Sequence, residues 1–265
     1  MTTRKDRRME VLFGFFGTLF IAIVLPIAAC LTPGYTPLKN TVSSLGEGQV
    51  KSLFSIGFVV AGSLLIPFFL YLERELVNIE DNVRRLATGV SVFTCVCIAL
   101  VGIIPDETYI EAFLIFHAFV AVIAFTGSGI YIVLYSILMY QGPKSKLYKG
   151  PGFKKYLAYY GFVIGGVLIL LLITLNPLIE WILTILIIIW VLITALQCIA
   201  FKFFNIPGVY YKRSQYPEAL KLFEDAMDIL DKLNLNDEPI AETLSENINF
   251  IKKELNKDQD KPNEQ

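Results

Sequence analysis

The chain has 265 residues, of which 55% are hydrophobic and 18% are charged, and its mean hydropathy is +0.58. Soluble domains of this size carry more charge and fewer apolar residues, so this composition excludes an ordinary soluble fold. The formal net charge of −1 gives the chain no basic field of the kind that attracts nucleic acid, and we expect no nucleic-acid partner.

The N-terminal residues 1–10 are basic, and residues 11–203 hold six long apolar segments. Each segment is long enough to cross the ~30 Å hydrocarbon core of a bilayer as a helix. Because backbone groups in lipid must bond to each other, helices are the expected form throughout. The sequence therefore predicts an all-α polytopic membrane protein, a six-helix bundle with spans at about Val11–Leu31, Leu53–Leu72, Leu86–Ile104, Ala112–Tyr140, Leu157–Leu175 and Trp181–Phe201.

The connections between the spans alternate in charge. One side carries clusters of Arg and Lys in the N-terminus, in residues 74–85, in residues 144–155 and after the last span. The other side has only Lys39 and Lys51. Cytoplasmic loops are enriched in Lys and Arg, so both termini are predicted to lie in the cytoplasm of a multi-pass cell-membrane protein.

The first segment has an alternative interpretation. Basic residues, an apolar stretch and the tetrapeptide that ends at Cys30 resemble a lipoprotein signal that is cleaved before a lipidated cysteine. The apolar run exceeds the roughly 7–15 residues of a typical signal core, and five further spans follow it. A first membrane span is therefore favoured over a cleaved signal.

Residues 204–256 form a different kind of segment. Aromatic and basic residues after Phe203 are typical of an interfacial anchor, and two apolar stripes at helical spacing follow it, in residues 220–230 and 240–255. These stripes predict a cytoplasmic helical hairpin, and residues 216–226 resemble one helix of a tetratricopeptide repeat. The hairpin either packs on the protein itself or, through residues 214–256, docks a cytoplasmic protein partner. Residues 257–265 are charged and are predicted to be disordered.

Few residues in this chain are suited to metals, disulfides or known cofactors. All four cysteines (Cys30, Cys95, Cys97 and Cys198) lie in apolar segments, so no disulfide framework is indicated. A single histidine excludes a histidine-rich zinc or di-iron site. The sequence contains no P-loop, dinucleotide-binding glycine fingerprint, nucleophile elbow or HExxH pattern. We expect neither a metal nor a cofactor.

Polar residues are predicted to gather at the outward face. The first loop is rich in hydroxyl groups and glycine, and its candidate ligand-binding residues are Ser43, Ser44, Gly46 and Glu47. Backbone N–H groups in such a loop can bind an anion or shape a lid. The third and fourth spans are joined by a turn that holds Asp106, a further candidate. Ordinary solvated loop charges are the simpler interpretation for most of these acids.

His117 is the one Asp, Glu, His, Lys or Arg side chain inside a predicted span, about two turns into the fourth helix and so about 10 Å below its start. An ionisable group at that depth is unfavourable unless it faces the bundle or a wet cavity. Ser91, Thr94 or an acid of the turn could orient its ring. His117 is thus a candidate ligand-binding residue and, with Asp106 as orienting acid, a candidate catalytic base. A neutral histidine packed in the core is the alternative.

These same residues carry a resemblance to a known family. The resemblance to the prokaryotic six-span family named domain of unknown function 998 lies in residues 40–48 (NTVSSLGEG), residues 53–62 (LFSIGFVVAG) and residues 102–106 (GIIPD), followed in the next span by His117, Ala124 and Phe125. That family is similar in layout to the eukaryotic FRAG/DRAM/SFK membrane proteins. The resemblance implies a six-span fold without an established activity, and the eukaryotic relatives imply a link to lipid-anchor remodelling, membrane trafficking and autophagy.

Three functions remain open on the sequence. The first is an uncharacterised membrane protein that binds a membrane lipid or small amphiphile in an outward-facing pocket. The second is a membrane enzyme acting on lipid head groups, with His117 as general base and Ser43 or Ser44 as nucleophile. The third is a membrane scaffold that binds a partner through its helical hairpin.

Overall fold

The computed structural model describes residues 4–104, 111–142, 148, 150–204, 216–233 and 239–259. The chain divides into two compact units, Met1–Phe203 and Phe204–Gln265, and each is described by itself. The described residues are helical apart from short turns and contain no strand. The prediction of an all-α fold is therefore confirmed.

The first unit consists of six long helices. Each is long and apolar enough to cross a membrane, which confirms the predicted six-helix membrane bundle. The structure extends several of them beyond the predicted apolar cores, because polar residues continue the helix at its ends. The helices are α1 (Arg4–Leu31), α2 (Lys51–Glu75), α3 (Asp81–Ile103), α4 (Glu111–Gln141), α5 (Lys155–Thr174) and α6 (Pro177–Ile199).

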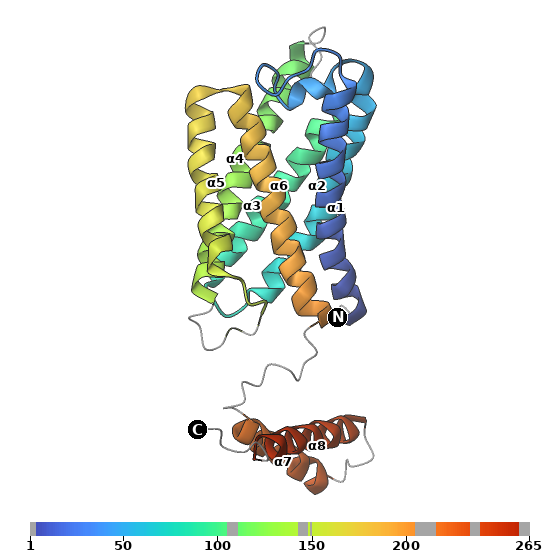
Figure 1. Ribbon diagram of the computed structural model, residues 1–265, viewed down its shortest axis with the longest axis vertical. Helices are drawn as coiled ribbons and strands as arrows, with labels where there is room; N and C mark the ends of the chain where they lie inside the picture. The colour runs from blue at the N-terminus through green and yellow to red at the C-terminus, as the bar shows by residue number, and fades with distance from the viewer. Residues whose placement is uncertain are drawn as a thin grey trace. The chain divides into compact units, whose positions relative to one another are not determined.

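The six helices are arranged as a closed ring (Figure 1). Each helix packs against the helix that precedes it and the one that follows it, and α6 packs against α1. The α1 residues Val24, Leu25 and Ala28 are buried among the other helices, so α1 is an integral part of the bundle. We call the two ends of the ring the loop-1 end, where residues 32–50 (loop 1) join α1 to α2, and the basic end, where α1 begins.

Helices α4 and α5 approach closely over the part of their length nearest the basic end. The backbone of Gly161 lies directly against the side chain of Ser136, and Gly129 lies directly against Leu168. A side chain at either glycine would collide with its neighbour, so these glycines permit the close packing that small residues allow between membrane helices. Beyond Gly129, toward the loop-1 end, the facing residues of the two helices instead line a pocket.

Ion pairs secure the basic end. Arg84 lies 2.9 Å from Asp81 and 3.5 Å from Glu73, and Lys202 lies 3.4 Å from Glu75. Arg74 forms a further pair with Glu10 at the start of α1. These side chains link the connections between helices at the end where the sequence concentrates its basic residues.

The second unit contains α7 (Tyr216–Lys232) and α8 (Pro239–Gln259), which pack against each other. Ile251 is buried against Leu220 and Phe223, and Lys252 lies 2.9 Å from Glu224 across the pair. The two predicted apolar stripes therefore face each other. Residues 234–238, expected to form the turn, and residues 260–265 of the predicted disordered tail lie outside the described residues. The cytoplasmic placement of this helix pair stays a prediction.

Candidate functional site

Loop 1 folds back onto the bundle through its own apolar residues. Two 3₁₀ turns, Ser43–Gly46 and Gly48–Val50, place Val42 and Leu45 in the core of the loop-1 end. Gly46 is buried, and a Cβ atom there would lie 3.1 Å from the ring of Phe54 on α2. Loop 1 is therefore a packed layer over the end of the helix ring.

The start of α6, which is far from loop 1 in the sequence, holds loop 1 in place. Pro177 occupies the first turn, and the side chain of Asn176 accepts a hydrogen bond from the Leu178 N–H, so the helix begins at a defined residue. This fixed first turn presents Glu180 and Trp181 to loop 1. The Val42 N–H donates a hydrogen bond to Glu180 Oε1 at 2.9 Å, across 138 residues of sequence.

Tyr35 is the centre of a second set of bonds between the same two elements. Its hydroxyl group donates to the Thr41 carbonyl oxygen at 2.7 Å and accepts a hydrogen bond from Trp181 Nε1 at 2.8 Å. Burial raises the pKa of Tyr35 to about 12, although the hydrogen bond from Trp181 works in the opposite direction. The phenol therefore keeps its proton, and with it the hydrogen bond to the Thr41 carbonyl oxygen, through the physiological pH range.

His117 lies on the inner side of α4 and is 2% exposed. Its Nδ1 lies 2.7 Å from the carbonyl oxygen of Ile104, at the end of α3. A carbonyl oxygen can only accept, so Nδ1 carries the proton, and in the neutral ring Nε2 is an acceptor. Nε2 is buried, and it has no hydrogen-bond partner within the described part of the chain.

A backbone carbonyl therefore orients the histidine ring. The sequence favoured Ser91, Thr94 or an acid of the turn for this role. The hydroxyl group of Ser91 instead donates to the Thr88 carbonyl oxygen within its own helix.

A pocket of about 310 Å³ opens where α4 and α5 separate. Its polar lining comes from loop 1, α4 and the first turn of α6, and its apolar lining comes from α4 and α5. We call it the polar pocket. The polar lining residues are Thr41, Ser43, His117 and Glu180.

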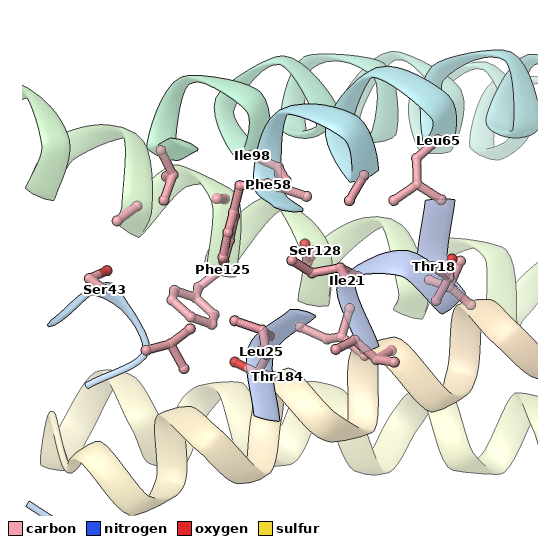
Figure 2. Close-up of a pocket in the computed structure, with 18 of the residues that line it drawn as sticks. Thr18, Ile21, Leu25, Ser43, Phe58, Leu65, Ile98, Phe125, Ser128 and Thr184 are labelled. Carbon is pink, nitrogen blue, oxygen red and sulfur yellow. The ribbon is translucent and has the colours of Figure 1, made fainter. Parts of the chain in front are cut away.

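A second cavity, of about 90 Å³, lies beside the polar pocket at the centre of the ring, and we call it the apolar cavity. Residues from α1, α2, α3, α4 and α6 line it, and its surface is almost wholly apolar. Ser43, Ala121 and Phe125 line both spaces, so the two are adjacent. Figure 2 shows Ser43 at one end of the apolar cavity, Thr18 near the other, and the ring of Phe125 between them.

The arrangement is amphipathic. Hydroxyl groups, a carboxylate and an imidazole nitrogen lie at the loop-1 end, and an apolar space leads inward from them. Ligand sites of this kind are largely apolar with a few polar groups that fix orientation. The geometry suits a molecule with a polar head and an apolar tail.

The sequence of this chain matches the family described as "Protein of unknown function (DUF998)" over residues 15–197. The chain belongs to the DUF998 family. The match includes every residue that lines the polar pocket and the apolar cavity, whereas α7 and α8 lie beyond it. No curated protein and no solved structure matches the chain. The similarity to the FRAG/DRAM/SFK proteins stays a prediction.

The structure of this DUF998 protein brings together two of the predicted site residues, Ser43 and His117. The hydroxyl group of Ser44 donates to the Thr41 carbonyl oxygen, so Ser44 shapes loop 1 rather than the pocket wall. Gly46 packs on Phe54, and Glu47 is exposed. Asp106 lies outside the described residues.

Sequence reasoning did not assign the other residues of the polar pocket to the site, among them Thr41, Phe125 and Glu180. Glu180 carried a usable signal, because it is an isolated acid at the start of a very apolar span and directly precedes a tryptophan. Phe125 stood out only as part of the family resemblance and not as a pocket residue, because it is one of 20 phenylalanines in an apolar chain.

The chemistry available at the site is limited by what the histidine contacts. A serine–histidine pair would need the Ser43 hydroxyl group to donate to His117 Nε2, and within the described residues that nitrogen has no partner. Among the same residues, no group of three or more His, Cys, Asp or Glu side chains is placed to hold a metal ion. The hydroxyl groups, the carboxylate and the imidazole that line the polar pocket can each form hydrogen bonds.

Proposed function

We propose that this DUF998 protein binds a membrane amphiphile, with the polar head in the polar pocket and the apolar tail in the apolar cavity. The observation that carries the proposal is that the two spaces are adjacent and share Ser43, Ala121 and Phe125 as lining residues. His117 lines the polar pocket, and its buried Nε2 has no hydrogen-bond partner among the described residues, which is unusual for a buried polar atom. A ligand donor at that nitrogen removes the unfavourable state.

The position of the pocket supports entry from the membrane. Its walls include Val122 on α4 and Leu172 on α5, which are both exposed on the outside of the ring. An amphiphile in the bilayer would pass between the separated ends of α4 and α5 without leaving the lipid phase. Nearer the basic end, the glycine contacts keep α4 and α5 packed against each other.

The distribution of Lys and Arg indicates on which side of the membrane the polar pocket lies. The loop-1 end carries few basic residues, whereas the other end carries the Arg and Lys clusters. We therefore assign the polar pocket to the outer leaflet of a cell membrane and both termini to the cytoplasm.

A cavity-filling variant tests the proposal. Ala121→Phe places a ring where the two spaces adjoin, and Ile115→Phe places the same side chain on the outer surface of the same helix, where Ile115 is 61% exposed. Native mass spectrometry of protein purified in mild detergent should show a bound lipid on the wild type and on Ile115→Phe. The same lipid should be lost from Ala121→Phe. Equal lipid retention by all three proteins would contradict the proposal.

A further inference from the structure

We infer that the polar pocket selects a head group that donates hydrogen bonds and carries no negative charge, such as the glycerol hydroxyls of a monoacylglycerol. This inference rests on the proposed function and specifies the class of its ligand. Two independent features of the pocket support it: the state of the His117 ring and the charges around the pocket.

The histidine offers an acceptor to the ligand. The Ile104 carbonyl oxygen fixes the ring proton on Nδ1, so Nε2 of the neutral ring presents a lone pair. His117 lines the polar pocket, and its buried Nε2 has no partner within the described residues, so a ligand hydroxyl or ammonium group that enters beside the ring can donate to it. An ionised phosphate or carboxylate oxygen has no proton to donate, so its lone pair would face the lone pair of Nε2.

The charged residues around the polar pocket also disfavour an anionic head group. Among the described residues, the polar pocket is lined by the carboxylate of Glu180 and by no Lys or Arg. The described residues of the loop-1 end, 32–51, 104, 111 and 175–180, hold three acids against two lysines. A buried anion requires a partner of opposite charge, and this pocket provides none from its walls. An anionic head group is therefore disfavoured by both the nearest groups and the wider field.

The test compares two photoactivatable probes with the same diazirine-bearing acyl chain. One is a monoacylglycerol, and the other is a lysophosphatidic acid, which adds the negative charge. Both are supplied to the full-length protein in phosphatidylcholine nanodiscs, and cross-linked peptides are mapped by mass spectrometry. We expect labelling of the α4 peptide that contains Ala121 and Phe125 to be about tenfold stronger with the monoacylglycerol, as one hydrogen bond can provide.

Two variants assign the preference to the pocket. In His117→Asn the side-chain amide can still donate to the Ile104 carbonyl oxygen, but the acceptor at Nε2 is removed. Monoacylglycerol labelling should fall toward the lysophosphatidic acid level. Ala118→Arg places a cation on the exposed wall of the pocket and should raise lysophosphatidic acid labelling. Ala112→Arg adds the same charge to an exposed position of α4 outside the pocket and should leave both signals unchanged.

The outcomes separate the two proposals. Equal labelling of the α4 peptide by both probes, or stronger labelling by lysophosphatidic acid, would overturn the head-group inference and leave amphiphile binding intact. Labelling confined to outward-facing residues such as Phe119 with both probes would overturn both. A misfolded variant would lose labelling, whereas Ala118→Arg is expected to gain labelling by lysophosphatidic acid. This result therefore cannot arise from misfolding.

Discussion

Trp181 Nε1 donates a hydrogen bond to the hydroxyl group of Tyr35 at 2.8 Å, and this bond joins the first turn of α6 to loop 1 across 146 residues of sequence. The two rings also meet edge to face, with centroids 6.1 Å apart. The Val42–Glu180 bond lies beside it and joins the same two elements. Because Thr41 and Ser43 line the polar pocket, the shape of the pocket depends on these contacts.

Replacing Tyr35 by phenylalanine should loosen loop 1. The change keeps the ring but removes the donor to the Thr41 carbonyl oxygen and leaves the part-buried Trp181 N–H without its acceptor. We expect the free energy of unfolding to fall by about 1–2 kcal/mol and the bond after Lys39 to be cleaved faster by trypsin. Thermal unfolding in detergent and limited proteolysis measure the two effects. Tyr156→Phe, at a tyrosine that is 54% exposed, is the matched control and should behave like the wild type.

Tyr35 should also lose its proton at a higher pH than an ordinary tyrosine. Its pKa is raised from 10.0 to about 12, chiefly by burial. A raised pKa in the folded state means that the stabilisation is complete below pH 10 and is lost as the pH rises through about 12. The difference between the ultraviolet titration curves of the wild type and Tyr35→Phe isolates this phenol. A difference curve centred at pH 10 would show that Tyr35 is solvated and that the bonds to loop 1 are not formed.

Hydropathy was sufficient to predict the six helices, because each segment must supply about 20 apolar residues to cross a bilayer. It could not predict their exact ends. The structure begins α1 at Arg4 and α2 at Lys51, since charged residues continue a helix readily once it leaves the hydrocarbon. The closed ring was also beyond the sequence, because the packing of α6 against α1 brings together the first and last spans.

The candidate site was only partly predictable, for similar reasons. His117 was prominent because it is the only histidine, and Ser43 because it lies in a loop rich in hydroxyl groups. The group that orients His117 is the main-chain carbonyl of Ile104, and a main-chain group has no signature in the sequence. Glu180 stands out in the sequence as an isolated acid, but it meets loop 1 only after the ring closes, so no local pattern could show that loop 1 is its partner.

The seam between α4 and α5 should be sensitive to any added side chain at Gly161. A Cβ atom there would collide with the Ser136 hydroxyl group, so Gly161→Ala should lower the free energy of unfolding by about 1–3 kcal/mol. Gly166 lies on the same helix with open space around its Cα, and Gly166→Ala should be neutral or slightly stabilising. Thermal unfolding of the two variants in one detergent makes the comparison. Adding Ser136→Ala to Gly161→Ala should recover part of the loss, because it removes the colliding atom. Equal stability of the two single variants would mean that the helices do not approach this closely.

The assignment of the loop-1 end to the outer side of the cell membrane predicts a one-sided pattern of cysteine labelling. In a Cys30→Ser background the remaining native cysteines, Cys95, Cys97 and Cys198, are buried. Leu38→Cys places a thiol in loop 1 at a position that is 69% exposed, and Asn82→Cys places one at an exposed site of the basic end. A membrane-impermeant maleimide applied to intact cells should label Leu38→Cys and not Asn82→Cys, and lysis should make both reactive. Labelling of Asn82→Cys alone in intact cells would reverse the orientation and would move the polar pocket to the cytoplasmic leaflet, while leaving its chemistry unchanged.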